Sequence, residues 1–492
     1  MQIMQDKISV NILLLTLVSI CIIFLQQGEI NRDGVMYLTQ SQYIVEGNWD
    51  KAMEIYNWAF FSILIAGLHQ LTGLSLQYAA HMINVALFVL ASFFFIKNVT
   101  LVSLNKTNIL FATLILLTSI PLMDDYLSMV LRDQGQWAGF MIGVYGYLRW
   151  IKSPQWLWAA LWQAGFLFGT LFRPECLLFN ILLPLSHQLF IVKTERIKAF
   201  IQSVSIPIVG VLLLPILWFI LSVDVSAIDF ARLNEIILRP SRFLNTMLQP
   251  LAIETQNYFL KVLIADYALS FKYFFLSYVL VYKWAAGLGL LHLFLFGYAI
   301  QQRLISSPYL KALAIFFIIS SIISTINLYT TFVLANRYWV MNFWIVYIVA
   351  AIGLGHLWRT IEHYKHPKQS WMKWGLVSIM TIFLLNIVID KPEQHFEQQA
   401  GRWVKEQQLD LNNIYFNQSR VAFYAGVLAH DQVDLDTAVN QIQYPYLMIR
   451  YQRFKEFKEI KHYQAIQYFP SREQPKVVVY QRAGNEKQQS IK

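Results

Sequence analysis

Asp33 lies in the segment NRDG, directly after the first apolar run of the chain. A carboxylate at such an interface, beside Arg32, stays ionised at neutral pH and can accept a proton from an attacking hydroxyl group. The same residues can also cap a helix and turn the chain where it leaves a membrane. The residue types alone favour capping, and a general base at Asp33 is the functional alternative.

A second group of acids lies in PLMDDYLSMVLRDQGQW, where Asp124, Asp125 and Asp133 accompany Arg132 between two apolar segments. These carboxylates could serve as a second acid, as ligands of a cation such as Mg²⁺, or as substrate clamps. A solvated loop of interfacial charges is the alternative, favoured for at least two of the acids. We single out Asp133, because an arginine precedes it as one precedes Asp33.

Two arginines stand at the ends of apolar segments, Arg173 in GTLFRPECLL and Arg337 in VLANRYWVMN. Charge at that depth in a membrane is costly and usually marks function. A guanidinium offers a rigid fork of donors that matches phosphate oxygens, so both arginines could hold a lipid phosphate. Two structural roles stay open: Arg337 can snorkel beside Tyr338 in an aromatic belt, and Arg173 can pair with Glu175.

Other chemistries find little support in the sequence. It contains no GxGxxG, P-loop, HExxH or GxSxG arrangement, so nucleotide-driven transport and serine hydrolysis are not indicated. Cys21 and Cys176 cannot make a disulfide framework and have no metal-ligand spacing. The net charge of +10 resides in short loops rather than in one stripe, which argues against nucleic acid as a partner.

The composition places the chain in a bilayer. It is 57% hydrophobic and only 14% charged, whereas soluble domains contain roughly 25% charged residues. About eleven runs approach the length of a membrane span. These runs cover residues 9–25, 79–96, 108–122, 137–150, 157–173, 176–192, 203–222, 275–299, 312–334, 339–358 and 374–389. The shorter run 58–72 contains His69 and Gln70, and we interpret it as an interfacial or re-entrant helix.

Basic residues set the expected topology, because short cytoplasmic loops carry the excess of lysine and arginine. With a cytoplasmic N-terminus, every predicted inner loop is basic and the acids gather on the opposite side. The predicted fold class is an all-α membrane protein with a small α/β domain at its C-terminus. Residues 1–390 form the membrane domain, with outer loops 26–78, 123–136 and 223–274, and residues 391–492 form the outer domain.

The C-terminal tail is polar and about 100 residues long, enough for a small domain. Its segments NNIYFNQS, YPYLMIRYQ and PKVVVYQR are typical of short strands. The stretch EQQAGRWVKEQQ is typical of a helix.

Several short motifs follow one another in an order known from one enzyme superfamily. They are RDGVMYLTQSQYIVEG, LRDQGQWAGFMIGVYGYLRW, TLFRPECLLF, ANRYWVMNFWIVYIV, and GRWVKEQQ with YFNQSRVAFYAG. Their order and placement resemble the GT-C glycosyltransferases, in particular the bacterial branch of the protein O-mannosyltransferases and the lipid A aminoarabinose transferase. One departure is that many relatives carry Asp-Glu in the first loop, whereas Gly34 follows Asp33 here.

The resemblance implies a glycosyltransferase in a bacterial inner membrane, with its C-terminal domain in the periplasm. Its donor would be a sugar on a polyprenyl phosphate, and its acceptor a lipid, a glycan or a protein. Asp33 would deprotonate the acceptor, Asp133 would orient a substrate, and the arginines would stabilise the leaving phosphate. Besides these two catalytic acids, the expected substrate-binding residues are Arg132, Arg173, Glu175, Arg337, Tyr338, Asp124 and Asp125.

Two other functions stay open. The first is a polymerase or ligase of surface polysaccharide, which Arg232, Arg239 and Arg242 in the third outer loop would suit. The second is a transporter of lipid-linked glycans, which should show charges near the bilayer midplane and interrupted helices in matching halves. No cofactor is identified from the sequence, and a divalent cation stays open.

Overall fold

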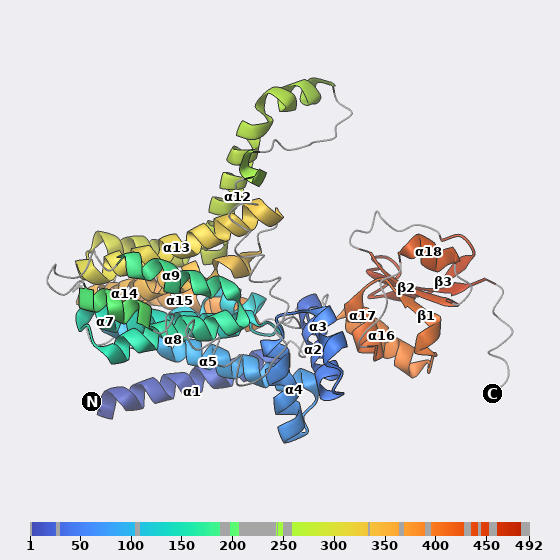
Figure 1. Cartoon of the computed structure of the whole chain (residues 1–492), viewed down its shortest axis with the longest axis horizontal. Coiled ribbons are helices and arrows are strands. Elements are labelled where there is room, and N and C mark those ends of the chain that lie inside the picture. Colours follow the sequence, from blue (N-terminus) through green and yellow to red (C-terminus); the bar gives the residue numbers. More distant parts are fainter. Residues whose placement is uncertain are drawn as a thin grey trace. The chain divides into compact units, whose positions relative to one another are not determined.

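The computed structural model describes most of the chain, and its residues divide into two compact units (Figure 1). Unit 1 comprises Met1–Ile22, Met82–Leu127 and Leu131–Val388, and unit 2 comprises Ile23–His81, Ser128–Val130 and Ile389–Lys492. The described residues are 2–25, 30–103, 109–186, 197–205, 243, 245–248, 258–332, 335–363, 369–388, 395–427, 434–440, 444–451 and 460–483.

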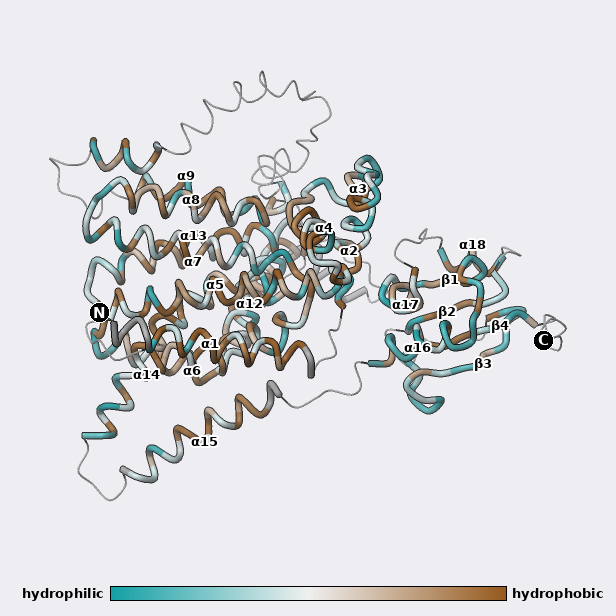
Figure 2. Tube along the Cα trace, turned by 90° about the horizontal axis from the view of Figure 1, so that it is seen from below, coloured by the Kyte–Doolittle hydropathy of each residue, from teal (hydrophilic) through white to brown (hydrophobic). Residues whose placement is uncertain are grey.

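Unit 1 is made of helices. These are α1 (Gln2–Leu25), α5 (Leu76–Val102), α6 (Ile109–Leu117), the π-helix η1 (Pro121–Asp125), α7 (Asp133–Lys152), α8 (Trp156–Phe172), the 3-10 helix η2 (Pro174–Cys176), α9 (Leu177–Ser186), α12 (Tyr258–Gln301), α13 (Ser307–Thr331), the 3-10 helix η6 (Asn336–Trp339), α14 (Val340–His363) and α15 (Gln369–Val388). Helices such as α1 and α8 are hydrophobic over most of their length (Figure 2). Within α12, Gly289 has a positive φ of 74° and interrupts the regular helix.

Four helical segments in the described part of the chain are long and apolar enough to cross a membrane, which indicates a membrane protein. They are Leu76–Val102, Tyr267–Gln301, Ser307–Thr330 and Asn336–His363. The expected count of about eleven spans is not confirmed. Shorter apolar helices lie at several other predicted spans, and most of the run 203–222 lies outside the described residues, as do Arg232, Arg239 and Arg242.

Helices α7 and α8 form a hairpin, and glycine residues allow their backbones to pack closely. A Cβ atom added at Gly139 would lie 2.4 Å from the backbone nitrogen of Gly169 and 2.6 Å from the carbonyl oxygen of Gly165. One at Gly146 would lie 2.6 Å from the nitrogen of Trp162. Small residues at such spacing let two helix backbones approach closely inside a membrane. The start of α7 and the end of α8 are therefore held side by side.

The first part of unit 2 is a small helical assembly of α2 (Arg32–Val45), α3 (Trp49–Ile55) and α4 (Phe60–Thr72). Buried Gln40 joins the three helices: its amide donates to the carbonyl of Ala52 at 2.8 Å, and its oxygen accepts from the Ser62 hydroxyl at 2.8 Å. Helix α4 has 13 residues, too few to cross a bilayer. The segment predicted to be interfacial is thus a short helix within unit 2.

The C-terminal part of unit 2 contains the strands β1 (Ile414–Phe416), β2 (Tyr446–Arg450), β3 (Tyr463–Phe469) and β4 (Val477–Arg482) in the order β1-β2-β4-β3. β1 runs parallel to β2, and the other two pairings are antiparallel. The helices of this part are α16 (Phe396–Glu406), the 3-10 helix η8 (Leu411–Asn413), α17 (Ser419–Ala425) and α18 (Leu435–Asn440).

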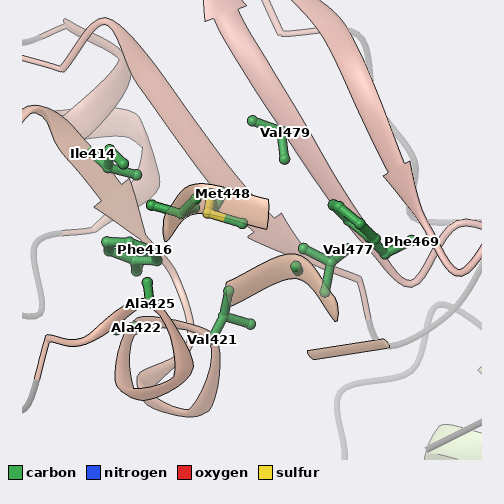
Figure 3. Close-up of a cluster of buried hydrophobic side chains, with 11 residues drawn as sticks. Ile414, Phe416, Val421, Ala422, Ala425, Met448, Phe469, Val477 and Val479 are labelled. Atoms are coloured by element: carbon green, nitrogen blue, oxygen red, sulfur yellow. The ribbon is translucent and has the colours of Figure 1, made fainter. Parts of the chain in front are cut away.

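Each face of this sheet has its own core. On one face, Val421 of α17 packs with Val477 and Met448 (Figure 3). Val404 of α16 belongs to the same cluster. Ala438 of α18 packs with other side chains on the opposite face. The small C-terminal sheet expected from the sequence is present: β1, β2 and β4 lie within the predicted segments, and β3 was not predicted. Helix α16 begins one residue before its predicted segment and ends within it.

Candidate functional site

The ion pair of Asp133 and Arg173 is the centre of a polar cluster in unit 1. Asp133 is the first residue of α7, and Arg173 is the residue that follows α8, so the hairpin brings the two together. The guanidinium of Arg173 donates a short hydrogen bond to the Asp133 carboxylate, and both side chains are buried. Burial of either charge alone would be costly, and pairing offsets that cost.

Local sequence explains the position of Arg173. Pro174 follows it, and a residue before proline avoids helical backbone angles. Helix α8 therefore ends at Phe172, and Arg173 is extended, with φ −140° and ψ 113°. The next turn, η2, places the Glu175 carboxylate 3.5 Å from the same guanidinium. Arg173 is thus paired with two buried carboxylates, and the expected pair with Glu175 is present in the structure.

Tyr338 connects Arg173 to the second arginine. The guanidinium carbon of Arg173 lies 5.0 Å from the centre of the Tyr338 ring, and that of Arg337 lies 5.5 Å from it. Both distances suit a cation–π contact. The carbonyl of Tyr338 accepts a hydrogen bond from the Ser324 hydroxyl on α13, at 2.9 Å, which fixes this turn against α13.

Three arginines act on one carboxylate at the centre of the cluster. Arg132, Arg173 and Arg337 all act electrostatically on Asp133. The carboxylate of Glu175 lies 3.5 Å from the guanidinium of Arg173. Arg337 and Tyr338 are half-buried, whereas Arg173 and Asp133 are buried. A half-buried cation beside an aromatic ring is suited to bind an anion such as a phosphate.

Asp124 and Asp125 are the last residues of η1 and are half-buried. Asp125 acts electrostatically on Tyr126 and Tyr347. Among the side chains that the structure describes, no three histidine, cysteine, aspartate or glutamate residues are grouped to hold a metal ion.

Asp33 belongs to unit 2. It lies in the first turn of α2, half-buried, with Arg32 exposed before it. The helix dipole favours a carboxylate at this position. Gly34 fills a space without room for a side chain, because an added Cβ would lie 2.9 Å from the Cβ of Val130 and 2.7 Å from Oδ1 of Asn31.

Two polar residues of the structure were not predicted from the sequence as site residues. Tyr126 receives a hydrogen bond from the backbone of Arg337, and its only signal in the sequence was its place after two aspartates. Lys272, on α12, is buried and donates to the carbonyl of Thr246, and its ammonium lies 5.8 Å from the ring of Phe332. A lysine within an apolar helix was the available signal, since such residues are rare in membranes.

Comparisons with known proteins give no family. No protein-family model matches the chain, and no curated protein matches it.

Proposed function

We propose that the protein is a glycosyltransferase of a bacterial inner membrane that takes a sugar from a polyprenyl phosphate and transfers it to a lipid, glycan or protein acceptor at the periplasmic face. The observation that carries the proposal is the placement of Arg173 and Arg337 against one tyrosine ring in a unit of apolar helices. A polyprenyl chain needs an apolar environment, and its phosphate needs cations where that apolar environment ends.

The two arginines take different roles in this proposal. Arg173 is already paired with Asp133 and Glu175, so its charge is largely compensated and it positions Tyr338 and Asp133. Arg337 also acts electrostatically on Asp133, but it is half-buried on the same ring and more exposed than Arg173, so it is the arginine that can reach a phosphate. Negative charge grows on the phosphate oxygen as the donor breaks, and a guanidinium held in place stabilises that charge.

The reaction is an inverting substitution at the anomeric carbon. A carboxylate accepts the proton of the acceptor hydroxyl, and the oxygen forms a bond to the anomeric carbon. The bond from that carbon to the phosphate oxygen breaks, and polyprenyl phosphate leaves with the electron pair. Asp33 keeps the role of general base that the sequence resemblance assigns to it. Asp133 serves as the anchor of Arg173 rather than as a base, because its carboxylate is committed to that ion pair.

Transfer of radiolabelled sugar from a panel of polyprenyl-phosphate sugars tests the proposal, using membranes that contain the full chain. Arg337→Ala should lower transfer by about 100-fold, as the loss of one stabilising donor does elsewhere. Arg337→Lys should retain part of the activity, and Asp33→Asn should abolish transfer. Lys311→Ala, at an exposed position in α13, is the matched control and should transfer at the wild-type rate.

Equal transfer by wild type and Arg337→Ala would remove the arginine from the phosphate site. Equal transfer by Asp33→Asn would return Asp33 to helix capping. Absence of transfer from every donor in the panel, with expression verified, would overturn the proposal in favour of a polymerase, ligase or transporter.

A further inference from the structure

A groove lies on the C-terminal sheet of unit 2, and none of the candidate site residues lines it. Its volume is about 1010 Å³, near the upper end for small-molecule sites, which span roughly 300–1,000 Å³. Strands β3 and β4, the turn before β3 and the loop between the two strands supply its walls. The lining residues that matter for its chemistry are Lys461, His462, Tyr463, Tyr468, Arg472 and Tyr480.

Hydrogen bonds hold two of the tyrosine rings in place. The Tyr463 hydroxyl donates to the carbonyl of Tyr444 at 2.6 Å, and the hydroxyl groups of Tyr480 and Tyr451 lie 2.6 Å apart. Both tyrosines are buried within the core on this face of the sheet, Tyr463 at 9% and Tyr480 at 2% exposure. A wall fixed before binding loses little conformational entropy when a ligand arrives.

Tyr468 is the lining tyrosine with a half-exposed ring. The guanidinium carbon of Arg472 lies 5.8 Å from the centre of this ring. An aromatic face is electron-rich and attracts polarised C–H groups or a cation. A pyranose ring presents such C–H groups on one face and hydroxyl groups at its edge, so it suits a wall made of tyrosine.

The charged side chains that line the groove are basic. Lys461 and Arg472 are exposed, and His462 stands beside them. Among the described residues that line the groove, none is aspartate or glutamate. The guanidinium of Arg482, 5.7 Å from the centre of the Tyr463 ring, adds a further cation on β4. Glu473 follows Arg472 in the chain but does not line the groove. Lysine and arginine in a lining without a carboxylate favour an anion, and the arginine fork pairs with a carboxylate or a phosphate through two parallel hydrogen bonds.

We propose that this groove binds an acidic oligosaccharide, one of whose sugar rings stacks on Tyr468 and whose acidic groups pair with Lys461 and Arg472. A neutral glycan would leave the cations without partners. An anionic membrane is flat and would contact protruding side chains rather than tyrosines in a groove. The proposal stands independently of the transferase reaction, since it rests on unit 2 alone.

Binding of fluorescent trigalacturonic acid to the full chain in neutral detergent, followed by thermophoresis, tests the proposal. The variant Lys461→Glu with Arg472→Glu should bind at least about tenfold more weakly, because hydrogen bonds to charged groups are lost and repulsion is added. Arg402→Glu is the control: Arg402 is exposed on α16, which packs on the opposite face of the sheet. Maltotriose, a neutral trisaccharide, should bind at least about tenfold more weakly than the acidic one.

A second pair of variants tests the aromatic wall. Tyr468→Ala should weaken binding of the acidic trisaccharide, whereas Tyr468→Trp should retain it, since stacking needs a ring and not the hydroxyl group. Equal loss in Arg402→Glu would show general attraction to a basic surface and overturn the site. Equal affinity for maltotriose would overturn the acidic ligand. Binding to phosphatidylglycerol vesicles that depends on the same two cations, without binding of the trisaccharide, would assign this surface to lipid instead.

Discussion

Arg173 and Asp133 are 40 residues apart in the chain and form a buried ion pair. The glycine-packed hairpin of α7 and α8 brings the two residues together, because α7 begins at Asp133 beside the point where α8 ends, just before Arg173. Arg173 also pairs with Glu175, so the pair is unequal: one arginine compensates two carboxylates.

Because Arg173 pairs with two carboxylates, variants of this pair should differ in stability. Arg173→Ala removes the cation that pairs directly with both buried carboxylates and should lower the free energy of unfolding by about 3–5 kcal/mol. Asp133→Ala should cost less, because Arg173 keeps Glu175. The double variant should cost less than the two single losses added together. Unfolding of the purified chain in a detergent titration measures all three. Strictly additive losses, or a larger loss for Asp133→Ala, would contradict the pairing described.

The close approach of α7 and α8 gives the next prediction. Gly139→Leu places a side chain where the backbone of α8 lies within 2.6 Å of the added Cβ, so the helices must separate and the pair of Asp133 and Arg173 must open. We expect a loss of more than about 3 kcal/mol, or failure to accumulate folded protein. Gly297→Leu, on α12, is the control because its added Cβ meets no atom within 4 Å. Equal behaviour of the two variants in the same detergent titration would show that the glycine contact is not required.

The sequence identified the residues of this cluster, but it did not predict the contacts between residues that are distant in the chain. Arg173 and Arg337 were recognised because charge at the end of an apolar segment is costly, and the pair with Glu175 followed from their proximity in the chain. The shared contact with Tyr338 depends on how α8 and η6 pack, and no local pattern encodes that packing. Strand β3 was missed because its glutamines interrupt the apolar pattern, although its tyrosine, isoleucine and phenylalanine residues are typical of strands.

Gly34, which follows Asp33, is explained by packing rather than by its neighbours in the chain. A side chain such as glutamate would not fit here, because Val130 and Asn31 fill the space beside the backbone. Val130 is distant in the chain, and only the fold identifies it as a neighbour. The sequence therefore showed the glycine and could not explain it.

A pH effect is expected at Glu397, a buried carboxylate of α16 that pairs with Arg420 at 2.8 Å and Arg450 at 2.5 Å. Burial raises the pKa of Glu397 above its ordinary value of 4.5, and the two arginines only partly oppose the shift. The folded state therefore holds this proton more tightly than the unfolded state does. The stabilisation is complete below pH 4.5 and is lost as the pH rises through the raised pKa.

Amide hydrogen exchange of β2 in the full chain, corrected for intrinsic rates, measures this effect. Wild-type protection should fall as the pH rises through that window, and Glu397→Gln should remove this component because it cannot titrate. Protection that grows with pH in the wild type and not in the variant would show instead that the arginines outweigh burial and depress the pKa.

The last prediction concerns Tyr424 of α17, whose hydroxyl links three segments of unit 2. It accepts a hydrogen bond from the backbone nitrogen of Ile30 at 3.0 Å and one from the amide of Gln398 at 3.3 Å. Helix α17 also packs against α2, which begins two residues after Ile30. The hydroxyl thus ties the entry to α2, and with it the turn that carries Asp33, to the C-terminal part of the same unit.

Tyr424→Phe removes the acceptor and keeps the ring. The nitrogen of Ile30 then loses its partner in a buried position, which costs about 1–3 kcal/mol. Hydrogen exchange at Ile30 and in the first turn of α2 should therefore speed up by about 5-fold or more, while β4, whose core does not include this hydroxyl, should exchange as in the wild type. Unchanged exchange at Ile30 would show that this bond does not anchor the segment. Faster exchange throughout β4 would show that the ring, and not the hydroxyl bond, had been disturbed.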